Sequence, residues 1–190
     1  MIGFCHLPKT GGTSLVQGMR DAGMNVWVPT PPEGVEPWDV KFWGQNPPPG
    51  TDVVSGHLHH DTWDQFDVDE WVTVLRHPIH RWASHFYWLN RYKAQGRYLL
   101  PPTNLMSSML RWYDHDTFQD IGLSEWWHFD NLSKAAAWFG VALPADRHKR
   151  SGFESFSTDF EWAAIHAANA MDVEMWEALH PQSVKEWTVG

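Results

Sequence analysis

The fold of this 190-residue chain is constrained most by its short apolar segments. Each of them ends at a proline or a glycine or leads into a helical pattern. Three of them are expected to be strands: residues 2–7, 52–55 and 71–75. Each is a continuous apolar run rather than an alternating one, which is typical of strands in a parallel sheet covered on both faces. Stretches with helical spacing of apolar residues separate them. The pattern therefore predicts an α/β fold with a mainly parallel sheet.

The helices expected between the strands follow from apolar residues three and four apart, with glycine or proline near the ends. They are expected over residues 13–24, 78–93, 104–113, 131–139 and 159–179, with an edge strand at 125–129. The proline-rich residues 29–50 are interpreted as an irregular surface excursion, because too little chain precedes them to fold alone. We therefore expect a single domain over residues 1–190.

Composition and charge exclude several classes of protein. The chain carries 14 Lys or Arg against 23 Asp or Glu, a formal net charge of −9, whereas nucleic acids and anionic membranes select basic surfaces. No apolar run approaches the about 20 residues that a membrane-spanning helix needs. The one cysteine, Cys5, permits no internal disulfide and lies in an apolar run, where it is expected to be a buried hydrophobe. We expect a cytoplasmic protein with no nucleic-acid partner and no membrane span.

Basic residues are concentrated in two short segments despite the acidic average. Residues 76–97 contain five Lys or Arg and no Asp or Glu, and residues 147–150 contain three more. Such islands in an acidic chain indicate a local anion site, with a solvated helix face as the alternative.

The loop after the first expected strand carries the groups that phosphate binding needs. Residues 7–14 read LPKTGGTS and lead into the first expected helix. Two glycines let the backbone approach a ligand, a helix N-terminus offers N–H groups, and a lysine with hydroxyl side chains adds charge and donors. The motif differs from a Walker A loop, in which the lysine follows the second glycine, because Lys9 precedes both. A Gly-Gly turn with a solvated lysine is the alternative.

A second anion-binding position is expected where the third strand ends. Residues 72–78 read VTVLRHP, so Arg76 lies at the carboxyl end of a strand, where α/β proteins bind ligands. Its planar guanidinium suits a phosphate. Ser84 follows eight residues later, about two turns into the expected helix. A purely structural junction between strand and helix is the alternative.

Together these motifs resemble the nucleotide site of sulfotransferases that use 3′-phosphoadenylyl sulfate (PAPS). Residues 9–14, KTGGTS, look like the loop that binds the 5′-phosphosulfate, and Arg76 with Ser84 looks like the strand and helix that bind the 3′-phosphate. The longer stretch 6–14, HLPKTGGTS, is most similar to the carbohydrate branch of the heparan 2-O type. The chain departs from many relatives at His77, where they have aspartate between the arginine and the proline.

The resemblance implies a P-loop-like, three-layer α/β fold with a central, mainly parallel sheet flanked by helices. It implies PAPS as the sulfuryl donor, adenosine 3′,5′-bisphosphate as its product, and no metal. Residues 147–152, RHKRSG, are similar to the family's basic loop that closes over the nucleotide. The donor-binding residues that the resemblance implies are Lys9, Thr10, Gly11, Gly12, Thr13, Ser14, Arg76, Ser84, Lys149 and Arg150.

A histidine-rich segment, residues 56–61 (GHLHHD), follows the second expected strand. Sulfuryl transfer to an alcohol needs a base, and an imidazole with an ordinary pKa of about 6.5 accepts a proton at neutral pH. The resemblance places this base in a Gly-His pair, which makes His57 the candidate catalytic base, with Lys9 as the second catalytic residue. Whether His59, His60 and Asp61 take part in catalysis stays open.

A metal site is the competing interpretation of the same histidines, and structural histidines are a third. His57, His59 and Asp61 match the start of the H-x-H-x-D-H motif of metallo-β-lactamase-type hydrolases. Thr62 stands where that motif has its final histidine. A metal-dependent hydrolase is therefore kept as an alternative function.

The sequence thus predicts a sulfotransferase that moves a sulfuryl group from PAPS to the hydroxyl of a saccharide or another small alcohol. A P-loop-like nucleotide-binding protein or kinase is the other alternative and would require Mg²⁺. The acidic remainder of the chain favours a neutral acceptor over a sulfated polyanion. Six tryptophans could either rim an acceptor cleft or pack in the core: Trp27, Trp38, Trp43, Trp63, Trp88 and Trp112.

Overall fold

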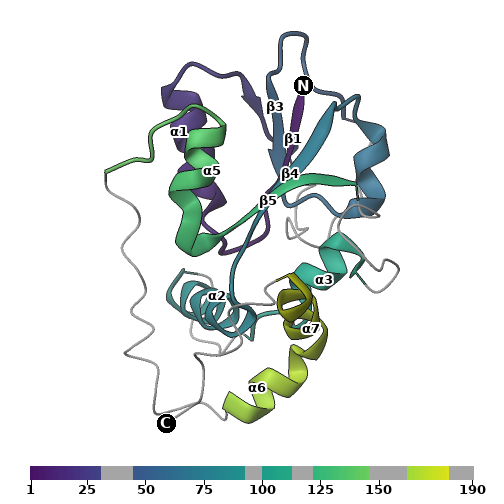
Figure 1. Ribbon diagram of the computed structural model, residues 1–190, viewed down its shortest axis with the longest axis vertical. Helices are drawn as coiled ribbons and strands as arrows, with labels where there is room; N and C mark the ends of the chain where they lie inside the picture. Colours follow the sequence, from purple (N-terminus) through teal and green to yellow (C-terminus); the bar gives the residue numbers. More distant parts are fainter. Residues whose placement is uncertain (31–44, 93–99, 113–121, 146–161, 180–190) are drawn as a thin grey trace.

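The computed structural model describes residues 1–30, 45–92, 100–112, 122–145 and 162–179 (Figure 1). Within these ranges five strands form one sheet, with every pair parallel and the spatial order β2-β3-β1-β4-β5. The strands are β1 (Ile2–Cys5), β2 (Val26–Trp27), β3 (Val53–Gly56), β4 (Glu70–Leu75) and β5 (Leu123–His128). The α/β fold with a central parallel sheet flanked by helices is confirmed.

Helices and short 3-10 turns surround this sheet (Figure 1). Helices α1 and α5 lie on one face of the sheet, and η2, α3 and α7 pack on the other. The longest described helix, α2, lies beyond the carboxyl ends of the strands (Figure 1). The bounds are α1 (Gly12–Asp21), η2 (His60–Gln65), α2 (Pro78–Tyr92), α3 (Leu105–Leu110), η4 (Phe129–Asn131), α5 (Leu132–Trp138), α6 (Trp162–Ala168) and α7 (Ala170–Leu179). None of these described helices is long and apolar enough to cross a membrane.

The inner strands β1, β3 and β4 are mostly apolar because their part of the sheet is buried on both faces. Phe4 and Val53 belong to the core formed with α1 and α5, whereas the next residues, Cys5 and Val54, belong to the opposite core. Successive side chains of a strand point to opposite faces, so strands covered on both faces carry apolar residues at consecutive positions.

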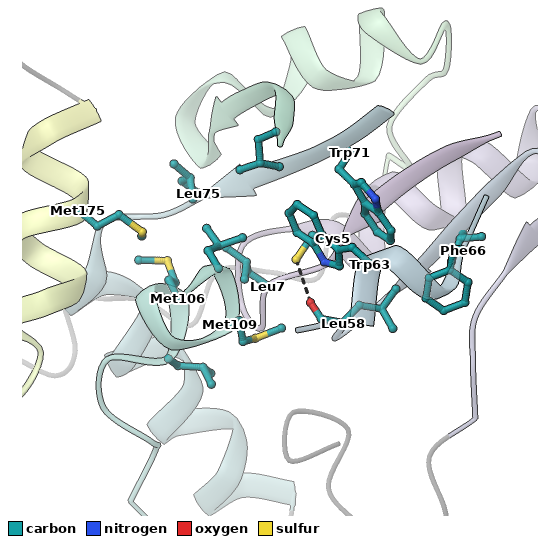
Figure 2. Packing of buried hydrophobic residues seen from close by; sticks show 14 residues of the cluster. Cys5, Leu7, Leu58, Trp63, Phe66, Trp71, Leu75, Met106, Met109 and Met175 are labelled. Atoms are coloured by element: carbon teal, nitrogen blue, oxygen red, sulfur yellow. Dashed lines mark hydrogen bonds between the residues drawn. The ribbon is translucent and has the colours of Figure 1, made fainter. Parts of the chain in front are cut away.

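The second core is rich in tryptophan and methionine (Figure 2). Trp63 of η2 stacks on Trp71 of β4, with ring centroids 4.6 Å apart and planes 14° from parallel. The Cys5 thiol is fully buried and donates to the Leu58 carbonyl at 3.3 Å. Burial raises the pKa of Cys5 to about 12, so this thiol stays protonated at neutral pH, as a buried hydrophobe should.

One expectation, a long helix over residues 159–179, is wrong in its described part. Two helices, α6 and α7, meet at Asn169 instead (Figure 1). The Asn169 side chain is buried, and its amide donates to the Ile165 carbonyl at 2.8 Å. The Asn104 side-chain oxygen accepts hydrogen bonds from the first backbone N–H groups of α7, those of Met171 and Asp172. A cap supplied by a distant segment starts a new helix here, and helical periodicity does not reveal such a cap.

Two further elements differ from the expectation. The short edge strand β2 was not expected, and the first strand ends at Cys5 rather than at residue 7. The backbone beyond Cys5 leaves the sheet because Leu7 N–H bonds back to the Cys5 carbonyl at 3.1 Å. That turn begins the loop between β1 and α1.

Candidate functional site

The order of the strands places one candidate site at the carboxyl ends of β1 and β4. From β1 the chain runs to β2 and β3 on one side, whereas β4 leads to β5 on the other side. Loops that depart in opposite directions leave a crevice between them, and this is where open parallel sheets bind ligands. The loop after β1 carries Lys9, and Arg76 directly follows β4. The fold therefore brings the two expected anion-binding motifs to adjacent strands.

The loop after β1 has a backbone shape that needs its glycines. Gly11 adopts a φ of 89° and caps α1, which begins at Gly12. A Cβ atom at Gly12 would lie 2.1 Å from the His6 ring, so no larger residue fits without displacing that ring. The Thr10 hydroxyl is buried and donates to the Leu7 carbonyl at 2.8 Å. Thr10 thus holds the loop with its side chain and can offer a ligand its backbone N–H.

Lys9 and Arg76 are linked directly. The Arg76 Nη1 donates to the Lys9 carbonyl at 3.1 Å, and the guanidinium lies over the Phe129 ring, 4.4 Å from its centroid. Burial lowers the pKa of Arg76 to about 10, and the carboxylate of Asp130 opposes that shift. Lys9 itself has a φ of 68°, a left-handed conformation that side-chain-bearing residues adopt at a cost.

The Lys9 side chain is half-buried, and its ammonium lies over an indole. Its Nζ is 5.6 Å from the centroid of the Trp88 ring, on α2. Burial, together with the positive charge of Arg76, lowers the pKa of Lys9 from its ordinary value of 10.5. A cation in partly desolvated surroundings next to a second cation attracts anions strongly, because neither charge is neutralised by the other.

The geometry of His57 suits a proton acceptor. The ring Nδ1 is hydrogen-bonded to the His6 carbonyl, and a carbonyl can only accept, so Nδ1 carries the proton. In the neutral ring the lone pair is then on Nε2. Burial lowers the pKa of His57 below 6.5, with the His6 carbonyl opposing and His59 adding to the shift. The imidazole is therefore neutral at pH 7, as a base must be.

One side of α2 carries polar and aromatic groups, of which Trp88 contacts the loop after β1. Arg81, Ser84, His85 and Trp88 recur at helical spacing, so they share a side of the helix. Ser84 and His85 are buried. The pKa of His85 falls to about 3 because the ring is buried and because Arg81, Lys9 and His57 lie in its surroundings. His85 therefore stays neutral at pH 7.

His6, His85 and Phe129 are parts of the site that sequence reasoning missed. The spacing of Arg81, Ser84 and His85 was a usable signal, because residues three and four apart on a helix share a face. The contact of Phe129 with Arg76 had no signal in the sequence, since 53 positions separate the two residues, from 76 to 129.

The interpretation of the basic residues 76–97 as an anion site is wrong for Arg81. Its guanidinium is fully buried and pairs with the equally buried Asp172 of α7, with Nη2 and Oδ2 3.7 Å apart. Arg81 is therefore part of an internal ion pair rather than an anion-binding surface. Other basic residues of the two islands, among them Lys149 and Arg150, lie outside the described residues.

The histidines after His57 do not form a metal site with it. Asp61 makes an exposed ion pair with Arg111 at 2.9 Å, and the His60 ring lies against Trp63. Across the described ranges, no group of three His, Cys, Asp or Glu side chains is placed to hold a metal ion. The hydrolase alternative thus has no ligand set among these residues.

The candidate cleft tryptophans separate into different roles. Trp63 is core, and Trp27 and Trp112 pack against the same core. Trp88 faces Lys9. Trp38 and Trp43 lie outside the described residues.

No protein-family model matches the chain, and no curated protein matches it either. Among solved structures, the crystal structure of a sulfotransferase from Alicyclobacillus acidocaldarius is similar over 98% of this chain and 97% of that one. The identity is 15% and the TM-score 0.49. A likeness of this degree identifies neither the reaction nor the site residues of this chain.

Proposed function

We propose that this protein is a sulfotransferase that moves a sulfuryl group from PAPS to an acceptor hydroxyl. The observation that carries the proposal is the meeting of Lys9 and Arg76 at the carboxyl ends of β1 and β4, joined through the Lys9 carbonyl. Two cationic groups beside a helix N-terminus suit a ligand with two separate anionic groups. A histidine in its proton-accepting form follows the neighbouring strand β3.

The residues present fit such a donor. The Arg76 Nε is buried, and among the described residues no acceptor lies within hydrogen-bonding distance of it. A buried guanidinium N–H without an acceptor is costly, and a phosphate oxygen would satisfy it. The glycines at 11 and 12 leave the start of α1 without side chains, so its N–H groups can approach an anion. We assign the 3′-phosphate to Arg76 with Ser84, and the 5′-phosphosulfate to Lys9 and the start of α1.

The chain's own residues divide the chemistry between them. PAPS supplies the sulfuryl group and leaves as adenosine 3′,5′-bisphosphate. The His57 Nε2 takes the proton from the acceptor hydroxyl as its oxygen forms the new bond to sulfur. The Lys9 ammonium stabilises the negative charge that develops on the phosphate oxygen as its bond to sulfur breaks. Arg76 holds the 3′-phosphate of the donor. The proposed reaction uses no metal.

The acceptor is proposed to be a neutral hydroxyl compound. The whole chain has a net charge of −9, and Arg81, one of its basic residues, is used internally by Asp172. A highly sulfated polyanion would meet a surface of the same sign, which disfavours its association. A saccharide or another small alcohol without such charge suits the chain better.

Binding of adenosine 3′,5′-bisphosphate should stabilise the protein without Mg²⁺. At about 100 times the dissociation constant, the ligand adds about 2.7 kcal/mol, or roughly 5–10 °C in melting temperature for a chain of this size. A thermal shift assay in the presence of EDTA measures this. AMP, which lacks the 3′-phosphate, is the matched control and should shift the melting temperature much less. A shift that requires Mg²⁺ would favour a kinase, and the absence of any shift would contradict the proposal.

The pH dependence of turnover should report His57 and Lys9. Activity requires neutral His57, whose pKa lies below 6.5, so kcat/KM should rise with pH below that value and be level at pH 7. Activity also requires protonated Lys9, whose pKa is lowered from 10.5, so kcat/KM should fall again as the pH is raised, with a midpoint under pH 10.5.

His57→Ala should lower kcat by about 10²- to 10⁴-fold and remove the acid limb of the pH profile, while nucleotide binding stays intact. Full activity of His57→Ala would exclude it as the base.

A further inference from the structure

Among the described residues, the Lys9 ammonium contacts an aromatic ring of α2 and forms no ion pair with a carboxylate. Its Nζ lies 5.6 Å from the centroid of the Trp88 ring, within the range of a cation–π interaction. We propose that Trp88 is a positioning residue, which holds the Lys9 ammonium at the carboxyl edge of the sheet in a position to bind an anion. The contact itself is independent of any reaction; its consequence for turnover rests on the proposed function.

A ring has one advantage over a carboxylate at this position. A carboxylate partner would neutralise Lys9 and repel an incoming phosphate or sulfate group. The face of an indole attracts the ammonium through its quadrupole while adding no net negative charge. Among the described residues, the charged or titratable groups that act on Lys9, or on which it acts, are Arg76 after β4, His6 after β1 and His85 on α2, whereas the carboxylate of Asp130 acts on Arg76. The attraction of the Lys9 ammonium for anions is therefore not reduced by its contact with the ring.

Trp88 is placed to act as a fixed support. It is half-buried on α2, a helix of 15 residues, one turn beyond the buried Ser84 and His85. The same helix is tied to α7 through the buried pair of Arg81 and Asp172. Lys9 by contrast lies on a loop with a left-handed backbone conformation and has a long, flexible side chain. Contact with a rigid helix restricts the positions of the ammonium.

Amine labelling of Lys9 tests this without reference to activity. Trace acetylation with acetic anhydride, read by peptide mass spectrometry, gives the reactivity of Lys9 relative to exposed Lys134 in the same molecule. Loss of the ring face disfavours the protonated amine, so Trp88→Leu should raise the relative reactivity of Lys9 about 5- to 30-fold near neutral pH. Trp88→Phe keeps an aromatic face and should change it by less than about 3-fold. If Trp88→Leu does not fold, Trp88→Met replaces it.

The outcomes separate this inference from the proposed function. Unchanged Lys9 reactivity in folded Trp88→Leu, or an equal rise in Trp88→Phe, would overturn the role of the ring. If the protein transfers sulfuryl groups, kcat/KM should fall in Trp88→Leu by about 5- to 30-fold and recover in Trp88→Phe, with the acid limb of His57 unmoved. If it transfers none and labelling still responds as stated, the positioning role stands and the proposed function fails.

Discussion

Replacing Lys9 with alanine is expected to lower kcat/KM for sulfuryl transfer by about 10²- to 10³-fold and to weaken binding of adenosine 3′,5′-bisphosphate. The loss has two causes. The ammonium is placed next to Arg76, where it attracts the donor's anionic end, and it stabilises charge that develops on the departing oxygen. Steady-state kinetics with labelled sulfate and calorimetric titration with the nucleotide measure the two effects separately.

The backbone of Lys9 offers a sharp control for this experiment. Its φ of 68° favours glycine, so Lys9→Gly removes the ammonium while relieving the cost of a left-handed residue. Lys9→Gly should therefore be as inactive as Lys9→Ala and no less stable than the native chain. Lys134→Ala removes an exposed lysine of α5 and should leave both activity and binding unchanged. Substantial turnover by Lys9→Gly would exclude Lys9 from the chemistry.

Replacing Asp172 with alanine is expected to reduce the free energy of unfolding by about 3–5 kcal/mol, because it leaves the buried Arg81 cation without its partner. Asp172 also organises α3. Its Oδ1 accepts from the backbone N–H and the hydroxyl of Ser107, both at 2.7 Å, and its Oδ2 accepts from the Met106 N–H at 3.2 Å. The two backbone N–H groups are orphan donors of the first turn of α3, which no carbonyl of the helix can satisfy. Urea unfolding followed by circular dichroism measures the change.

Two matched variants show whether the buried charge causes this loss. Glu174→Ala removes an exposed carboxylate from the same helix and should change stability by less than about 0.5 kcal/mol. Arg81→Met in the Asp172→Ala background removes the unpaired cation and should recover part of the loss. A double variant no more stable than Asp172→Ala would show that the lost hydrogen bonds of α3, rather than the charge of Arg81, dominate.

The parts of the candidate site that depend on neighbouring residues in the sequence could be predicted. Lys9 and the glycines of its loop were predicted as an anion-binding turn, and the positive φ of Gly11 agrees with the conformational freedom expected of it. The donor-binding and catalytic roles of these residues stay predictions. Trp88 was considered for an acceptor cleft, yet it faces Lys9. Arg81 was grouped with the anion site, yet it is buried against Asp172. In both cases a partner more than 70 positions away decides the role of the side chain.

The sequence by itself determined the α/β class, the parallel sheet and the loop between β1 and α1, because periodicity and glycine placement are local properties. Only the tertiary structure decided which side chains meet. The strand order β2-β3-β1-β4-β5 brings Lys9 next to Arg76, and a cap from Asn104 divides the last described helical stretch into α6 and α7. Such contacts join residues far apart in the chain. Their free energies depend on burial and distance, which exist only once the chain has folded.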